Sequence, residues 1–222
     1  AYAAPRRPAA PRVAKRSARG VEARYAESAA GRWGDDVVEV EAREAGKQWE
    51  PLAVDARKRT AFFATETPGA PVAFRCRAKN PRGVSAWSKL AEASSLQAPV
   101  QGGGAGPGYS WRQTTNLVRA VVPVPEGTRG RDVAVECTST KLSARLRDGA
   151  VFFDKAPLRK KVSPETLEWE LAEDDGGLAL VVTVEKLDRT FMAAEHWERL
   201  VAGHPPVDTQ AIPVALSQEF ED

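Results

Sequence analysis

The feature that most constrains the fold is a repeated alternation of apolar and polar residues in short runs. Residues 38–42 alternate valine and alanine with glutamate, residues 74–78 alternate apolar residues with arginine, and residues 167–171 alternate leucine and tryptophan with glutamate. Side chains point to opposite faces along a strand, so this period of two predicts strands with one buried and one solvated face. Turn signals such as Pro68-Gly69 separate the runs. The sequence therefore predicts an all-β protein built from antiparallel β-sandwiches.

The length of 222 residues is enough for two domains of about 100 residues each. Changes in composition along the chain mark where the domains begin and end. The predicted segments are a basic Pro/Ala-rich arm (1–20), a first sandwich (21–90), a Gly/Pro-rich linker (91–108), a second sandwich (109–210) and an acidic tail (211–222).

The period changes once, near the end of the second domain. Phe191, Ala194, Trp197 and Val201 are spaced by three, three and four residues. This spacing predicts one short C-terminal helix that ends at Gly203, before two prolines.

Composition excludes several classes of protein. The formal net charge of +2 does not indicate wholesale binding of nucleic acid. A membrane span needs about 20 apolar residues, and the longest apolar runs here are only a few residues long. The two cysteines, Cys76 and Cys137, fall in separate predicted domains, so no disulfide is expected, which favours a reducing compartment such as the cytoplasm.

The residues also lack the motifs of an enzyme. His196 and His204 have no metal-ligand spacing around them and lie beside no nucleophile motif. The glycine-rich run 102–108 lacks the Lys-Ser/Thr ending of a phosphate loop. We therefore expect no catalytic residues, no cofactor and no metal.

The end of the first predicted domain resembles a known module. Residues 68–80 read PGAPVAFRCRAKN, and residues 83–88 read GVSAWS. This pattern is similar to the last two strands of a fibronectin type III domain. Val72 stands where that family has its corner tyrosine, and Tyr25 stands in place of its tryptophan.

The second predicted domain carries several motifs in order. They are Tyr109-Ser110-Trp111, residues 122–128 (VPVPEGT) with Arg131-Asp132-Val133, residues 167–171 (LEWEL), Val184-Glu185-Lys186, residues 196–201 (HWERLV) and Pro206-Val207-Asp208-Thr209. Together they resemble the CS domain of the NudC family. The resemblance implies a compact antiparallel sandwich of the α-crystallin type that acts without catalysis. It also implies protein partners: the ninety-kilodalton heat-shock chaperone, β-propeller clients or dynein-pathway components.

The candidate partner-binding residues are aromatic or basic. Tyr109 and Trp111 are candidates, although packing at the sandwich edge is the alternative role for both. Trp169 and Trp197 are expected in the core. Two basic groups complete the set. Arg159, Lys160 and Lys161 are the first, and their alternative role is to protect an edge strand from aggregation. Arg6, Arg7 and Arg12 of the arm are the second, and the alternative for the arm is a solvated leader that binds nothing.

The function expected from these features is that of a non-enzymatic adaptor in the cytoplasm, similar to a NudC-like co-chaperone or dynein-pathway adaptor. Two sandwiches on one chain would bind two partner surfaces. The alternative is a structural subunit, or scaffold, of a large multi-protein assembly such as a cilium or part of the cytoskeleton. Stimulation of a chaperone by the free chain would favour the adaptor role. Stoichiometric co-purification with one stable complex would favour the structural role.

Overall fold

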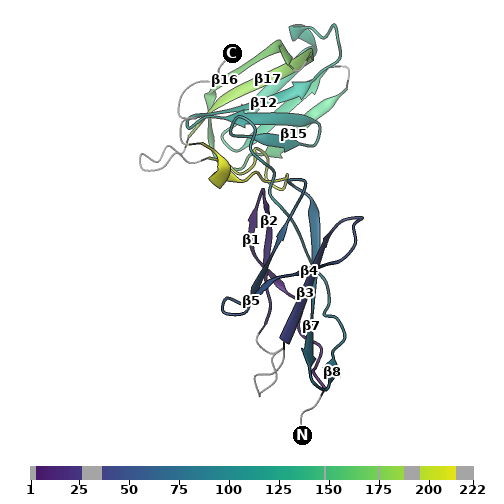
Figure 1. Cartoon of the computed structure of the whole chain (residues 1–222). Coiled ribbons are helices and arrows are strands. Elements are labelled where there is room, and N and C mark those ends of the chain that lie inside the picture. The colour runs from purple at the N-terminus through teal and green to yellow at the C-terminus, as the bar shows by residue number, and fades with distance from the viewer. Residues whose placement is uncertain (1–3, 27–36, 148, 175, 188–195, 214–222) are drawn as a thin grey trace. The chain divides into compact units, whose positions relative to one another are not determined.

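The computed structural model describes residues 4–26, 37–147, 149–174, 176–187 and 196–213 (Figure 1). The chain divides into two compact units, Ala1–Gln97 and Ala98–Asp222. The regular elements of the described residues are antiparallel strands and two short 3-10 helices, η2 (Gly130–Asp132) and η3 (Thr209–Ala211). The predicted all-β fold with antiparallel sheets is confirmed.

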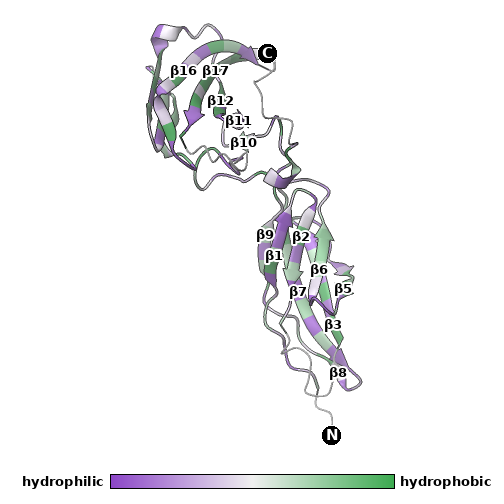
Figure 2. Cartoon of the chain, turned by 90° about the vertical axis from the view of Figure 1, so that its left-hand side faces the viewer, coloured by the Kyte–Doolittle hydropathy of each residue, from purple (hydrophilic) through white to green (hydrophobic). Residues whose placement is uncertain are grey.

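The first unit is built from two sheets that share one core. Val21 and Phe63 face Val40, Phe74 and Cys76 in this core, and the rings of Phe63 and Phe74 meet edge to face with centroids 6.4 Å apart. Figure 2 shows the alternation of hydrophobic and hydrophilic residues along these strands. One sheet has the order β1 (Arg12–Ser17), β2 (Gly20–Arg24), β6 (Thr60–Ala64), β5 (Val54–Asp55); the other has β4 (Glu50–Leu52), β3 (Val37–Glu44), β7 (Pro71–Asn80), β8 (Gly83–Val84), and β9 (Ala91–Ser94) also pairs with β7.

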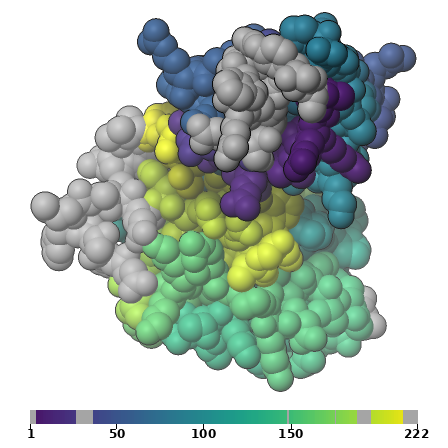
Figure 3. Space-filling model, turned by 90° about the horizontal axis from the view of Figure 1, so that it is seen from below, coloured from purple at the N-terminus to yellow at the C-terminus, as the bar shows by residue number. Residues whose placement is uncertain are grey.

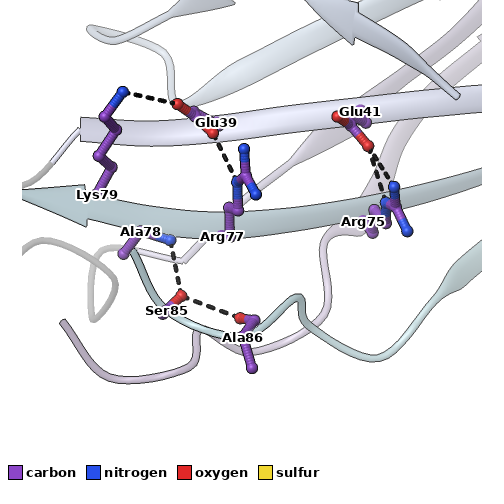
Figure 4. Close-up of polar contacts among 8 residues, drawn as sticks. All are labelled: Glu39, Glu41, Arg75, Arg77, Ala78, Lys79, Ser85 and Ala86. Carbon is purple, nitrogen blue, oxygen red and sulfur yellow. Dashed lines mark hydrogen bonds and ion pairs between the residues drawn. The ribbon is translucent and has the colours of Figure 1, made fainter. Parts of the chain in front are cut away.

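Charged pairs cover the solvent face of the second of these sheets. Figure 4 shows Glu39 on β3 pairing with Arg77 on β7, N···O 2.6 Å, and Glu41 pairing with Arg75 at the same distance. The register places each pair directly opposite, so the polar half of the sequence alternation becomes a ladder of cross-strand ion pairs.

The segment after β7 is held by serine side chains and by cation–π contacts. Ser85 Oγ accepts a hydrogen bond from the Ala78 N–H (3.0 Å; Figure 4), and Ser88 Oγ accepts one from the Cys76 N–H (3.1 Å). The indole of Trp87 lies over the guanidinium of Arg75, 4.2 Å from ring centroid to carbon. The GVSAWS motif therefore fastens this segment to β7.

The predicted arm is wrong for the described part of residues 1–20. Residues 12–17 form β1, which pairs with β2, and Pro8 and Pro11 are buried. The Cys76 thiol donates a weak hydrogen bond to the Ala9 carbonyl, at 3.4 Å. An edge strand tolerates charged residues and prolines, and a flexible arm is rich in the same residues. Composition therefore does not distinguish an edge strand from an arm.

The second unit packs a five-stranded sheet on a three-stranded sheet. Val118, Leu180 and Val182 of the first meet Leu142 and Phe153 of the second in its core. The five-stranded sheet has the order β10 (Gly104–Gly106), β11 (Tyr109–Gln113), β12 (Leu117–Pro123), β17 (Gly177–Lys186), β16 (Val162–Asp174), and the three-stranded sheet has β13 (Val133–Thr138), β14 (Lys141–Leu146), β15 (Val151–Pro157).

The predicted linker at residues 91–108 carries a strand in each unit, β9 and β10, so its description as a flexible connector is also wrong. A Cβ at Gly103 would overlap the backbone carbonyl of Trp111, and one at Gly106 would overlap the Tyr109 ring. The glycines here allow β10 to approach β11 closely rather than making the chain flexible.

The predicted C-terminal helix is wrong in its described part, because residues 196–203 form bends and turns; residues 188–195 lie outside the described residues. We call residues 196–213 the strap. Its backbone bonds to the segment after β15: the Arg159 N–H donates to the Leu200 carbonyl (2.9 Å), and the Ala202 N–H donates to the Pro157 carbonyl (2.8 Å). Figure 3 shows the strap (yellow) lying against the rest of its unit (green). The apolar side chains that suggested a helix, Trp197 and Val201, are buried in the sandwich core instead.

A buried amide joins the strap to the sheet. Gln113, at the end of β11, is fully buried and makes four side-chain hydrogen bonds. Its Nε2 donates to the carbonyls of Gly102 (2.6 Å) and Trp197 (2.7 Å), and its Oε1 accepts from Lys186 Nζ and from the Trp197 N–H, both at 2.8 Å. Lys186 is 2% exposed and also donates to the Thr114 carbonyl. Two motif positions of the CS resemblance, Lys186 and Trp197, thus meet at Gln113.

A second contact holds the other part of the strap. The Tyr109 hydroxyl and His204 Nδ1 lie 2.7 Å apart in a hydrogen bond. Burial raises the pKa of Tyr109, so this hydroxyl keeps its proton. The motif tyrosine therefore connects β11 to the turn after Val201.

Residues 98–213 should fold without the first unit, with a cooperative thermal melt. The fragment must begin at residue 98, because Gly102 and β10 complete the packing around β11. A fragment that begins at residue 109, which the sequence alone suggests, should melt at a lower temperature. A non-cooperative melt of 98–213 would contradict the division into two units.

Replacement of Gln113 by alanine should lower the free energy of unfolding of the 98–213 fragment by about 3 kcal/mol, because it leaves buried partners, one of them cationic, without their bonds. Urea denaturation followed by tryptophan fluorescence measures this. Gln210→Ala is the matched control, since Gln210 is exposed and only its backbone N–H bonds to Asp208. Equal costs for the two variants would contradict the network's role.

The stability of the same fragment should fall as the pH drops below about 6.5. His196 Nδ1 is buried without a hydrogen-bond partner. Burial lowers the pKa of His196, and the positive charge of Lys186 lowers it further. Because the folded pKa is depressed, the unfolded chain binds a proton first, and stability is lost on acidification. His196→Gln should flatten the dependence of the urea midpoint on pH between about 7.5 and 5.5; an unchanged slope would be evidence against this cause.

Candidate functional site

Two predicted contact residues, Tyr109 and Trp111, lie in the core of the second unit. Their side chains are 6% and 1% exposed. The Tyr109 ring packs edge to face on Phe153, with centroids 4.9 Å apart. These two residues therefore position the strap and the sheet and offer no surface to a partner, which corresponds to the packing role considered from the sequence.

The two tryptophans expected in the core differ in their exposure to solvent. Trp197 is 2% exposed, as predicted for a core residue, but Trp169 is 38% exposed and the prediction that it lies in the core is wrong. Trp169 sits opposite Val182 on the core-facing side of β16. Among the described residues, β16 is the last strand of its sheet, so no further strand lies beside Trp169 on that edge.

The predicted basic groups do not come together with the aromatic pair. Residues 159–161 lie in the connection between β15 and β16 rather than in a strand. Arg159 pairs with Glu198 of the strap, N···O 3.3 Å, and the Lys161 carbonyl accepts a hydrogen bond from the Leu187 N–H. Arg6, Arg7 and Arg12 belong to the first unit, where all three are exposed.

Sequence reasoning missed a hollow on the outer face of the five-stranded sheet, the face turned away from the core. This hollow has a volume of about 840 Å³. Its lining comes from β12, β17 and β16. The strand register places Arg119, Thr183 and Glu168 in one row across the three strands, and Val121, Val181 and Glu170 in the next row.

The floor and the rim of this hollow differ in chemistry. Val181 is only 7% exposed and provides an apolar floor, whereas Glu168 and Glu170 are exposed along β16. Glu185 adds a third carboxylate to the lining, against one guanidinium, that of Arg119, whose Nε donates to Thr183 Oγ1 at 3.3 Å. We call this hollow, with its three glutamates, the acidic groove.

An ion pair shapes the same outer face beside the acidic groove. Arg112 on β11 contacts Asp174 at the end of β16, N···O 2.7 Å, although β12 and β17 lie between them in the strand order. Val121, Ala179 and Val181 are buried as a small apolar cluster on this face. The sheet therefore curls enough to bury part of its outer face, which produces a concave surface.

The sequence contained a signal for the glutamates but not for the groove. The LEWEL motif alternates, so it indicates that Glu168 and Glu170 point away from Leu167 and Leu171. The positions of Arg119 and Glu185 beside them depend on the pairing of three strands, which the motif does not contain.

The described residues contain no group of three or more histidine, cysteine, aspartate or glutamate side chains arranged so that together they could hold a metal ion, and both cysteines are free thiols. Burial raises the pKa of Cys76 and of Cys137, which disfavours the reactive thiolate. The acidic groove offers shape, apolar area and charge, which are the properties of a binding surface. No helix in the described part of the chain is both long and apolar enough to cross a bilayer.

Comparisons with known proteins agree with the motifs of the second unit. The CS domain family matches residues 107–186. The chain is 32% identical over 104 residues to protein BOBBER 1 of Arabidopsis thaliana, which is 47% of this chain and 32% of that protein. It is 28% identical over 106 residues to the nuclear movement protein nudc of Schizosaccharomyces pombe, 47% of this chain and 59% of that protein. The chain thus spans less than two thirds of these relatives.

Solved structures give further likenesses. The CS domain of the human KIAA1068 protein overlaps 51% of this chain and 87% of its own length, with a TM-score of 0.38 and 22% identity. The FN1–FN3 domains of chicken CNTN1 overlap 83% of this chain and 68% of their own length, with a TM-score of 0.37 and 12% identity. Residues 107–186 therefore match the CS domain family, and about half of the chain is similar to the NudC and BOBBER proteins.

Proposed function

We propose that this chain is a non-enzymatic, co-chaperone-like adaptor that binds a protein partner in the cytoplasm through the acidic groove. The observation that carries the proposal is the groove itself: an apolar floor at Val181, bordered by three glutamates, on the exposed face of a CS domain. The relation to NudC supports the class of function.

The chemistry of the groove indicates what the partner presents. Three carboxylates and one guanidinium favour a basic surface. The floor accepts an apolar side chain, which supplies most of the affinity once it is desolvated. We therefore expect a partner segment that places an apolar anchor between lysines or arginines.

The first unit adds a second binding module in this proposal. Its residues 68–88 resemble a fibronectin type III domain, a module without catalytic residues of its own. Two modules on one chain convert the second binding event into an intramolecular one and raise the effective concentration at that site. The boundaries that we propose for the modules are residues 4–97 and 98–213.

Binding of the purified ninety-kilodalton heat-shock chaperone by the full chain, measured by calorimetry, tests the proposal. The double variant Glu168→Lys/Glu170→Lys should weaken binding about tenfold or more, because it reverses the rim charge. Glu126→Lys/Glu136→Lys is the matched control, since both residues are exposed in the same unit outside the acidic groove.

Saturable binding that only the groove variant weakens would support the proposal. Absence of binding by the unmodified chain would contradict the co-chaperone role, and equal affinities of the two variants would exclude the acidic groove as the contact. Co-purification in fixed stoichiometry with one assembly would instead favour a structural subunit.

A further inference from the structure

We infer that the free edge of β1 in the first unit binds an extended acidic segment of a partner protein, which adds to the sheet as a further strand. This site is separate from the acidic groove, and the inference does not depend on the function proposed for that groove.

The charge of the chain is divided unevenly between its units. Residues 1–97 contain 18 basic and 11 acidic residues, a net charge of +7, whereas residues 98–222 contain 14 basic and 19 acidic residues, a net charge of −5. The overall value of +2 hides this difference. The largest basic cluster of the first unit lies on and beside β1: Arg6, Arg7, Arg12, Lys15, Arg16 and Arg19.

Within the described part of the first unit, β1 has one paired edge and one edge that no strand covers. It pairs with β2 and is the last strand of its sheet. At its end, the Ser17 carbonyl accepts a hydrogen bond from the Leu96 N–H, at 3.0 Å. Residues 12–16 precede this contact, and all five are exposed. Their outward backbone groups are therefore a template for a further strand.

One pair of like charges lies across β1 and β2. Arg12 lies directly opposite Arg24 in the β1–β2 register, and like charges in this position destabilise a sheet. Among the described residues, Arg12, Arg16 and Arg24 form no ion pair. Charged side chains protect an edge strand from aggregation, but Arg24 lies on β2, which is not an edge strand, so edge protection does not account for its place opposite Arg12. A carboxylate on a bound strand would relieve their repulsion.

The two faces of this edge differ. Lys15 lies opposite Glu22 on the solvent face, whereas Val13 lies opposite the buried Ala23 and is itself 38% exposed. An acidic strand with uncharged residues at alternate positions therefore finds positive charge on the solvent face and the Val13 side chain on the other. A nucleic acid would use the positive charge but has no backbone donors and acceptors with the spacing of a strand, so the free edge favours a peptide.

The probe is a fluorescent peptide of about 12 residues in which glutamate alternates with threonine, added to the full chain and followed by anisotropy. We expect saturable binding that weakens as salt rises, because the contact is largely electrostatic. Arg12→Glu/Lys15→Glu/Arg16→Glu should weaken it about tenfold or more. The control Arg57→Glu/Arg82→Glu/Lys89→Glu makes the same change of charge at exposed positions elsewhere in the unit and should have a much smaller effect.

A second peptide, with proline in place of every threonine, keeps the charge but loses half of the backbone donors. We expect it to bind about tenfold more weakly. Equal binding of the two peptides would overturn strand addition, and tighter binding of an oligothymidylate would assign the surface to nucleic acid. If the triple variant loses its thermal melt, Lys15→Gln/Arg16→Gln replaces it, and undiminished binding by that variant would overturn the inference.

Discussion

The side chain of Gln113 is the contact on which the second unit depends. One amide bonds the loop before β10, the strap and the ammonium group of Lys186 at the end of β17. A glutamine can do this because its side chain offers both donors and an acceptor, and burial makes each bond costly to break. The strap has little regular structure of its own, so its position is decided by this network, by the Tyr109–His204 bond and by buried side chains such as Trp197.

The position of a strand at the edge of its sheet determines which side chains and backbone groups are exposed in both units. A strand in the middle of a sheet has both backbone edges paired, but β1 and β16 each have one neighbour in the strand order. That difference leaves Trp169 and residues 12–16 exposed. It also means that the surfaces proposed for partners differ in kind. The acidic groove is a side-chain surface, whereas the β1 edge offers backbone hydrogen bonds together with positive charge.

Local sequence patterns predicted the strands well where alternation was strong, as in β3 and β7, because burial on one face leaves a period of two. The motifs of the second unit also located the CS domain, since they place chemically specific residues at fixed spacing. Predictions from composition were weaker. Proline, arginine and glycine suggested an arm and a linker, but the same residues serve an edge strand and a close approach of two strands. The spacing of apolar residues before Gly203 suggested a helix. An irregular strap that buries Trp197 and Val201 produces the same spacing of three or four residues, so the pattern does not distinguish the two structures.

The sequence by itself determined the all-β class, the division of the chain into two sandwiches, the candidate residues on alternating strands and the absence of a recognisable catalytic motif. The tertiary structure decided which of those residues meet. Tyr109 and Trp111 became core residues because their face of β11 packs into the core that the two sheets share, and Glu168 and Glu170 became the rim of a groove because β16 pairs with β17 beside Arg119. Strand order and register come from contacts between residues far apart in the chain, and a local period of two contains no information about which strands become neighbours.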